Sequence, residues 1–303
     1  MILISLLGEQ PIPNLLPLWQ NPARYTAARF AVTESTLPLA ERLASVIAGD
    51  PRLGHIAVRQ PVLLRPYDIG YCRAHLNSIL MEHLLHDEEV VLNLTGGTKI
   101  MSLAALQAAY GSGVSLLYVS TETRRLIHLR SDGSEMAREP LAVQVSVRQY
   151  LAAHGIESSL HPAFRGEGPA RPVETPKSGD ALERRVETLL RHSGAFDDVR
   201  RNVFIRKPGR EEMVHNELDV VATRNGQLAV CSCKTSLEID KDDLYELAAL
   251  SRRESFGIYC EKVLVCEHEP SDAVKNRAAA DRVKLVYGSK IEHIAETLRA
   301  ALD

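Results

Sequence analysis

The chain has 303 residues, of which 45% are hydrophobic and 25% are charged, a composition typical of a folded globular protein with room for two domains. Its net charge of −3 excludes a globally basic surface, so any nucleic-acid-binding surface must be local. Apolar runs stay below the roughly 18 residues of a membrane span, and the five cysteines include no CxxC pair. These features predict a cytoplasmic protein without a membrane segment.

Strand and helix patterns alternate through the first half of the chain. Strands are predicted at 2–7, 27–32, 54–64, 90–95 and 114–121, and helices at 11–19, 35–49, 66–86 and 99–111. Repeated strand–helix–strand units of this kind predict a parallel sheet with helices on both faces. A hairpin follows at 124–147, with Asp132 and Gly133 in its turn.

The composition changes after this hairpin. A short helix is expected at 146–155, and the stretch 162–180 is rich in proline, glycine and charged residues, which is typical of a linker. We therefore predict an N-terminal domain at 1–147, a connecting helix and linker at 148–178, and a C-terminal domain at 179–303.

The C-terminal domain again combines helices and strands. Helices are predicted at 179–196 and 240–253, and strands at 199–206, 213–224, 227–234, 257–266 and 283–288, with one more helix before the last strand and one after it. Asn225-Gly226 is the strongest short signal for a two-residue hairpin loop. The pattern predicts a second α/β domain with a mixed sheet.

A glycine-rich turn, Asn-Leu-Thr-Gly-Gly-Thr-Lys at 93–99, joins a predicted strand to a predicted helix. Gly96 and Gly97 have no Cβ, so the backbone can approach a ligand closely. The following helix directs its free N–H groups and positive dipole end at the turn, and Lys99 adds a charge. The turn predicts an anion-binding cradle, although a Gly-Gly pair also occurs in tight connections without a ligand.

A second stretch, SLLGEQPIPN at 5–14, also follows a strand. Together with NLTGGTKIMSLAA at 93–105 it resembles the CRISPR-associated Rossmann fold (CARF) sensor domain, and more narrowly the type III CRISPR nucleases that join this domain to a restriction-type nuclease domain. The resemblance implies a homodimer that binds a cyclic oligoadenylate, in particular cyclic tetra-adenylate, across its two-fold axis. The ligand-binding residues that it implies are Gly8, Glu9, Gln10, Thr95, Gly96, Gly97, Thr98, Lys99 and Met101.

The hairpin at Asn225-Gly226 concentrates charge on one face. A two-residue loop places Asp219 opposite Ser232 and Glu217 opposite Lys234, with all four side chains on the same face of the sheet. The alternate residues are apolar and are expected to pack on a helix. A cross-strand Glu–Lys pair could be purely structural, but the same face could also hold an active site.

The C-terminal half resembles the metal-dependent nucleases of the PD-(D/E)xK type in the order of its elements: a helix, a hairpin and a second helix. The resemblance implies Mg²⁺ or Mn²⁺ as the cofactor, with Glu183 and Asp219 as its ligands. It also implies that Lys234 holds the attacking water and stabilises charge on the phosphate.

The motif is incomplete, because Ser232 stands where the (D/E)xK acid is expected. Glu217 on the same face is one replacement, and Glu246 on the next helix is another. The remaining alternative is a weak or inactive catalytic site.

The sequence therefore predicts a metal-dependent endonuclease that is activated by cyclic oligoadenylate and cleaves DNA or RNA. The alternative is a sensor without catalytic activity that binds nucleic acid or a partner; degradation of the ligand by the first domain ranks last, because that domain shows no dedicated general acid or base. Clustered basic residues support a polyanionic partner. They are Arg184, Arg185, Arg191, Arg200, Arg201, Arg206, Lys207 and Arg210.

Overall fold

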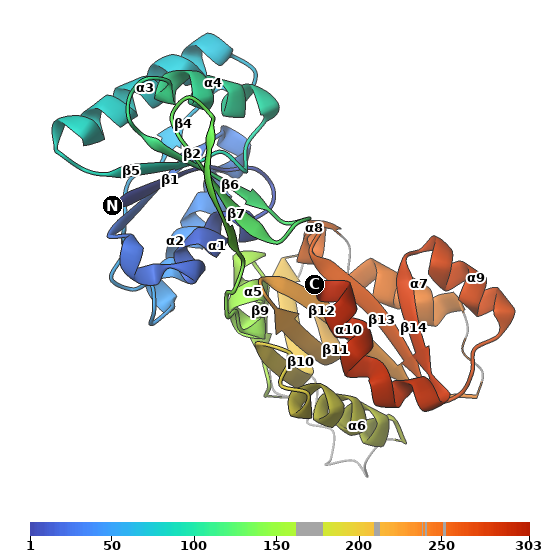
Figure 1. Cartoon of the computed structure of the whole chain (residues 1–303). Helices are drawn as coiled ribbons and strands as arrows, with labels where there is room; N and C mark the ends of the chain where they lie inside the picture. Colours follow the sequence, from blue (N-terminus) through green and yellow to red (C-terminus); the bar gives the residue numbers. More distant parts are fainter. Residues whose placement is uncertain (162–177, 209–212, 238, 240, 251–252) are drawn as a thin grey trace. The chain divides into compact units, whose positions relative to one another are not determined.

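The structure is a computed structural model that describes residues 1–161, 178–208, 213–237, 239, 241–250 and 253–303 (Figure 1). The chain forms two compact units, Met1–Val143 and Gln144–Asp303, each with its own sheet. Residues 162–177 of the predicted linker stretch lie outside the described residues. Within the described part, no helix is long and apolar enough to cross a membrane.

The first unit has a doubly wound architecture. Its sheet runs in the order β3-β2-β1-β5-β6-β7-β8, with β4 paired to β2; the strands up to β6 are parallel, and β7 and β8 are antiparallel. The strands are β1 (Ile2–Leu6), β2 (Ala27–Val32), β3 (Ala57–Val58), β4 (Val62–Leu63), β5 (Val90–Asn93), β6 (Ser115–Ser120), β7 (Arg125–Leu129) and β8 (Glu135–Pro140). The helices are α1 (Ile12–Gln20), α2 (Leu37–Gly49), α3 (Ile69–Leu85) and α4 (Lys99–Ala109), with 3₁₀ turns at Pro22–Arg24 and Glu34–Thr36. The predicted Rossmann-like sheet is confirmed.

Helices cover both faces of this sheet, with α3 and α4 side by side on one face and α1 and α2 on the other (Figure 1). Every residue of β1 is buried. That explains the unbroken apolar run at the N-terminus, since a central parallel strand has no face in contact with water.

Three predicted boundaries in this unit were wrong. The strand expected at 54–64 is two short strands, β3 and β4, interrupted before Pro61, which has no N–H to donate to a neighbouring strand. The helix expected from residue 66 begins at Ile69, because the Asp68 side chain accepts the N–H of Tyr71 at 2.9 Å and caps it. The last hairpin strand ends at Pro140.

The second unit has a mixed sheet, as predicted, in the order β14-β13-β12-β11-β10-β9. Strands β9 to β12 are antiparallel and β12 to β14 are parallel. The strands are β9 (Glu157–Ser159), β10 (Asp198–Pro208), β11 (Met213–Arg224), β12 (Gln227–Lys234), β13 (Cys260–Cys266) and β14 (Val283–Tyr287). The helices are α5 (Val147–Ala153), α6 (Ser178–His192), α7 (Lys241–Leu250), α8 (Arg253–Phe256), α9 (Asp272–Ala280) and α10 (Ile294–Leu302), with a 3₁₀ segment at Gly288–His293.

The β11–β12 hairpin has the predicted register. Arg224 pairs with Gln227, and the ladder continues to Val220 opposite Cys231. Asn225 and Gly226 both have positive φ, 48° and 75°, as the favoured two-residue loop requires. The apolar face packs as expected on helices, here α6 and α10. The buried residues of this core include Leu182, Val186, Val220, Ala222, Ala229, Cys231, Cys233 and Leu298.

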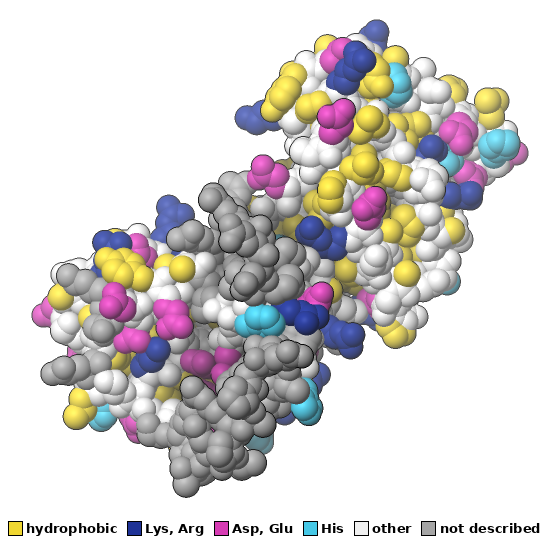
Figure 2. Space-filling view, turned by 180° about the vertical axis from the view of Figure 1, so that it is seen from behind, with side chains coloured by type: hydrophobic (Ala, Val, Ile, Leu, Met, Phe, Trp, Pro, Cys, Tyr) yellow, Lys and Arg dark blue, Asp and Glu magenta, His cyan; other side chains and the backbone are white. Residues whose placement is uncertain are grey.

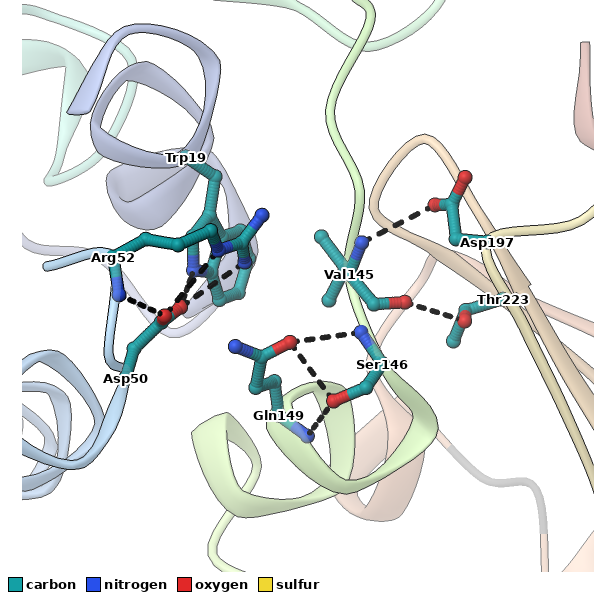
Figure 3. A network of polar contacts seen from close by, with 8 residues as sticks. All are labelled: Trp19, Asp50, Arg52, Val145, Ser146, Gln149, Asp197 and Thr223. Carbon is teal, nitrogen blue, oxygen red and sulfur yellow. Dashed lines mark hydrogen bonds and ion pairs between the residues drawn. The ribbon is translucent and has the colours of Figure 1, made fainter.

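Each unit contains a local network of hydrogen bonds that stabilises its own fold (Figure 3). In the first unit, the buried Asp50 carboxylate accepts the indole N–H of Trp19 at 3.0 Å and is ion-paired with Arg52 at 3.1 Å. Burial raises the pKa of Asp50, but its contacts with Arg52 outweigh this and lower the pKa overall. In the second unit, the Thr223 hydroxyl donates to the Val145 carbonyl at 2.5 Å and holds the chain just before α5.

The loops after β1 and β5 touch backbone to backbone. A Cβ on Gly96 would lie 2.0 Å from the Leu6 carbonyl oxygen and 3.0 Å from the Gly8 nitrogen. A Cβ on Gly8 would in turn lie 3.0 Å from the Gly97 nitrogen, and Gly97 itself has a φ of +74°. The three glycines therefore let two neighbouring loops meet at the carboxyl edge of the sheet.

We expect Gly96→Ala to destabilise the first unit by more than about 2 kcal/mol, because the new methyl group requires the backbone to move. Trp19 is the only tryptophan of the chain and lies in this unit, so its fluorescence during urea unfolding measures the effect. Gly49→Ala is the control, since a Cβ there meets nothing within 4 Å, and it should not lower stability. Equal stability of the two variants would contradict the close approach.

Candidate functional site

The first candidate site is the pair of glycine loops. Their threonine side chains are already engaged within the fold: the Thr95 hydroxyl donates to Asn93 Oδ1 at 2.6 Å and accepts the N–H of Val119 at 2.7 Å. The Thr98 hydroxyl caps α4 by accepting a main-chain N–H at 3.2 Å, and it donates to the Pro66 carbonyl at 2.6 Å. These two hydroxyls hold the loops in place.

The remaining predicted ligand residues differ in exposure. Met101 is fully buried, and its side chain lies beneath Gly97. Lys99 is exposed at the first position of α4 and has no ion pair with any described residue. Glu9 is also exposed, and the Gln10 carbonyl accepts the side-chain amide of Asn14 at 3.1 Å. What this edge offers an anion is the main chain of the glycines, the N-terminus of α4 and the charge of Lys99.

The second candidate site lies where the β11–β12 ladder ends. The Asp219 carboxylate accepts the main-chain N–H of Cys233 at 2.7 Å and the Ser232 hydroxyl at 3.3 Å. Asp219 and Ser232 are therefore neighbours, as the hairpin register predicted. Burial raises the pKa of Asp219, although these hydrogen bonds and the charge of Lys234 oppose the shift.

Glu183 approaches this carboxylate from α6. Its pKa is raised to about 7, first by burial and then by repulsion from Asp219, while Arg201 acts in the opposite direction. Glu217 on β11 adds to the repulsion. The Arg201 guanidinium lies 3.8 Å from Glu183. The structure thus brings three predicted carboxylates into one electrostatically coupled group.

Lys234 makes its closest ion pair with α7. Its Nζ lies 2.9 Å from Asp243 Oδ1 and 3.8 Å from Glu246 Oε2. Burial lowers the pKa of Lys234, but the contacts with Asp243 and Glu246 outweigh this and raise it overall. Asp243 was not identified as a site residue from the sequence, because nothing there distinguishes it from other acidic residues at the start of a helix.

The carboxylates of this site can be compared with the ligands that Mg²⁺ or Mn²⁺ requires. Among the described residues, no three His, Cys, Asp or Glu side chains converge into a closed metal-binding group. Mg²⁺ is commonly held by one or two carboxylates, with water and substrate oxygens filling its other positions. Glu183 and Asp219 have this chemistry, and a cation would relieve the repulsion between them. The residues therefore fit Mg²⁺ or Mn²⁺ in an open site.

The predicted basic cluster is largely neutralised within the fold. Six of its arginines form ion pairs. On the face of the molecule seen in Figure 2, basic and acidic side chains are interspersed. The pairs are Arg184–Asp180, Arg185–Glu292, Arg191–Glu187, Arg200–Asp198, Arg201–Asp180, Arg201–Glu187 and Arg206–Glu157. The side chains of Lys207 and Arg210 lie outside the described part of the chain. These arginines do not form a continuous basic surface.

The raised pKa of Glu183 gives a prediction for stability. The folded state holds this proton up to about pH 7, whereas an unfolded glutamate releases it near its ordinary value of 4.5. Stability from the neutral form is therefore present at low pH and is lost as the pH rises through 7. Glu183→Gln should unfold at a higher temperature than wild type at pH 8 and at a similar temperature at pH 4, as measured by calorimetry without metal.

Glu187→Gln on the same helix is the matched control. Glu187 is ion-paired with Arg191 and Arg201, so its loss should lower stability at pH 8 instead of raising it. A Glu183→Gln variant that is less stable than wild type at pH 8 would show that its ion pair with Arg201 dominates over the repulsion from Asp219.

Comparison with known proteins identifies both units. Residues 2–150 match the family model of the Card1 CARF domain, and residues 176–302 match that of the Card1-like endonuclease domain. Among curated proteins, none matches the chain by sequence.

Solved structures share the fold at low sequence identity. Protein VC1899 from Vibrio cholerae is 15% identical with a TM-score of 0.83, covering 99% of this chain and 97% of its own. Can2 from Sulfobacillus thermosulfidooxidans, solved in complex with cyclic tetra-adenylate, is 20% identical with a TM-score of 0.76, covering 100% of this chain and 99% of its own. A type III CRISPR defence DNA nuclease activated by cyclic oligoadenylate is 18% identical with a TM-score of 0.58; the match covers 95% of this chain but 48% of that one.

The two family matches together span most of the chain, in the order predicted from the sequence. The chain therefore belongs to the family of proteins that join a Card1-type CARF domain to a Card1-like endonuclease domain.

Proposed function

We propose that the protein is a metal-dependent endonuclease of type III CRISPR defence that is activated when its CARF domain binds a cyclic oligoadenylate. The observation that carries this proposal is the group of mutually repelling carboxylates, Glu183, Asp219 and Glu217, in a domain of endonuclease ancestry. Two proteins of similar fold support the ligand, since one was solved with cyclic tetra-adenylate and another is described as activated by cyclic oligoadenylate.

The ligand would sit on the glycine loops. Its phosphates are recognised by the main chain of Gly96 and Gly97, the N-terminus of α4 and the charge of Lys99. Because the Thr95 and Thr98 hydroxyls are engaged in the fold, they act by holding the loops. Cyclic tetra-adenylate is the expected ring.

A homodimer would present this site twice around a two-fold axis, matching the symmetry of the ring. Helices α3 and α4, which pack together, expose several large apolar side chains that a second copy would cover. These are Ile69, Met81, Leu85, Leu103 and Tyr110, each at least 40% exposed.

In the endonuclease domain, Glu183 and Asp219 would hold Mg²⁺ or Mn²⁺, which supplies electrostatic stabilisation of the phosphate charge. The Asp219 carboxylate is oriented by the Cys233 N–H and the Ser232 hydroxyl. Glu217 supplies the carboxylate that is missing at position 232. The charged Lys234 ammonium donates hydrogen bonds to the attacking water or to a phosphate oxygen, and while charged it has no lone pair to remove a proton.

A sensor without catalytic activity is the second candidate. It is favoured by the absence of an acid at Ser232 and by the ion pair that Lys234 makes with Asp243. In that case the second domain would bind nucleic acid or a partner without cleaving it. For the first candidate, the endonuclease, the substrate class is DNA or RNA.

We expect cleavage of plasmid DNA, single-stranded DNA or RNA in Mn²⁺ that depends on cyclic tetra-adenylate. Asp219→Asn and Glu217→Ala should both abolish it, because each removes one of the mutually repelling carboxylates, whereas Glu296→Gln on α10 should leave it unchanged. A modest effect of Glu217→Ala together with higher activity of Ser232→Glu would assign Glu217 a structural role. A chain that binds the ring and cleaves none of these substrates would favour the sensor.

Lys99→Ala should lower the affinity for cyclic tetra-adenylate at least about tenfold, because a hydrogen bond to a charged group is lost. The first 143 residues contain no other lysine. Lys99→Arg keeps the positive charge and tests whether charge alone is sufficient for binding the ring. Calorimetry should give one ring per two chains, and Arg138→Ala, an exposed cation on β8 that is ion-paired with Glu135, should bind as wild type does. One ring per monomer would contradict the dimeric site.

A further inference from the structure

We propose that the loop between β4 and α3 forms the base-binding part of the ligand site, with Tyr67 stacking on an adenine and Arg65 contacting a phosphate. The inference rests on the proposed function, because it assigns two residues to the same cyclic oligoadenylate. Neither residue belongs to the glycine motifs that indicated the cradle.

The topology of the sheet brings this loop to the cradle. Strand β4 pairs with β2, on one side of β1, whereas the helix that follows it leads to β5 on the other side of β1. The chain must therefore cross the carboxyl edge of the parallel strands between Leu63 and Ile69. It is fixed there by the hydrogen bond of 2.6 Å from the Thr98 hydroxyl to the Pro66 carbonyl. Thr98 is itself part of the Gly-Gly-Thr-Lys turn.

Tyr67 projects from the fixed loop into solvent. Its side chain is 82% exposed, the highest value among the exposed large hydrophobic residues of the described chain. The residues on both sides are held by hydrogen bonds. The Pro66 carbonyl accepts the Thr98 hydroxyl, and the Asp68 carboxylate accepts the N–H of Tyr71. An aromatic ring that is open to solvent, on a main chain held at both neighbouring residues, is a stacking surface for a base.

Arg65 lies on the other side of Pro66 and is also pre-positioned. Its guanidinium lies 4.4 Å from the centre of the Tyr71 ring, and that ring stacks on His75 at 3.8 Å. Arg65 is exposed and has no ion pair with the described residues. Its N–H groups therefore remain available for a phosphate oxygen, and it adds a second cation beside Lys99.

The two parts of a cyclic oligoadenylate match the two parts of this surface. Phosphates fit the glycine main chain, Lys99 and Arg65, whereas a base fits the open face of Tyr67. Stacking on an aromatic ring accepts any base. Tyr67 should therefore add affinity for a nucleotide ring over a simple polyphosphate, without selecting adenine from other bases.

The test is calorimetry of the full-length protein with two probes, cyclic tetra-adenylate and inorganic tripolyphosphate. Tyr67→Ala should weaken binding of the ring about tenfold or more and leave tripolyphosphate unaffected, because that probe has no base. Tyr67→Phe should bind the ring as wild type does. Arg65→Ala should weaken both probes, and Tyr245→Ala, an exposed tyrosine on α7 of the second unit, should change neither.

Different results would refute the stacking role of Tyr67 and the proposed function. Unchanged binding of the ring by Tyr67→Ala, with tight binding by wild type, would refute the stacking role and leave the proposed function standing. A Tyr67→Ala variant that is monomeric in sedimentation while wild type is dimeric would place Tyr67 in a subunit contact and also refute stacking. If wild type binds no ring, the proposed function fails and this inference fails with it.

Discussion

The register of the β11–β12 hairpin is the constraint on which the second domain depends. The positive φ angles of Asn225 and Gly226 fix a two-residue loop, and the pairing that follows is then determined along both strands. Val220 and Cys231 enter the core beneath α6 and α10, and Asp219 is left beside Ser232. A slip of one residue would exchange these faces and bury a carboxylate among apolar side chains. The core and the candidate catalytic site are thus two consequences of one turn.

The candidate nuclease site maintains an unfavourable distribution of charge. Glu183 and Asp219 repel each other in a partly desolvated position, and the nearest cations are committed in part elsewhere: Arg201 contacts Asp180 and Glu187, and Lys234 contacts Asp243. An arrangement that served stability alone would separate or neutralise such carboxylates. A divalent cation would offset this unbalanced negative charge, which supports the proposed metal dependence.

The CARF domain assigns separate tasks to the residues of its glycine loops. Glycines allow the loops to touch, the threonine hydroxyls hold them in place, and Met101 supports them from below. In the proposed ligand site, an anion would be bound by main-chain N–H groups and by exposed cations such as Lys99, which has no ion pair with the described residues. Pre-organisation of this kind lowers the entropic cost of binding, because few side chains must become ordered.

The sequence by itself determined the features that are encoded locally. Periodicity predicted the parallel sheet of the first domain and the mixed sheet of the second, and Asn225-Gly226 predicted a register that the structure reproduces. The same information misplaced the edge of the sheet, since two short apolar runs at 56–58 and 62–64 were joined into one predicted strand across Arg59, Gln60 and Pro61. Only the tertiary structure decided which charges from distant segments meet: Lys234 with Asp243 of α7, Arg185 with Glu292, and Arg206 with Glu157. Ion-pair partners depend on which elements fold next to one another and on how far side chains reach, and neither quantity is contained in the spacing of residues along one strand or helix.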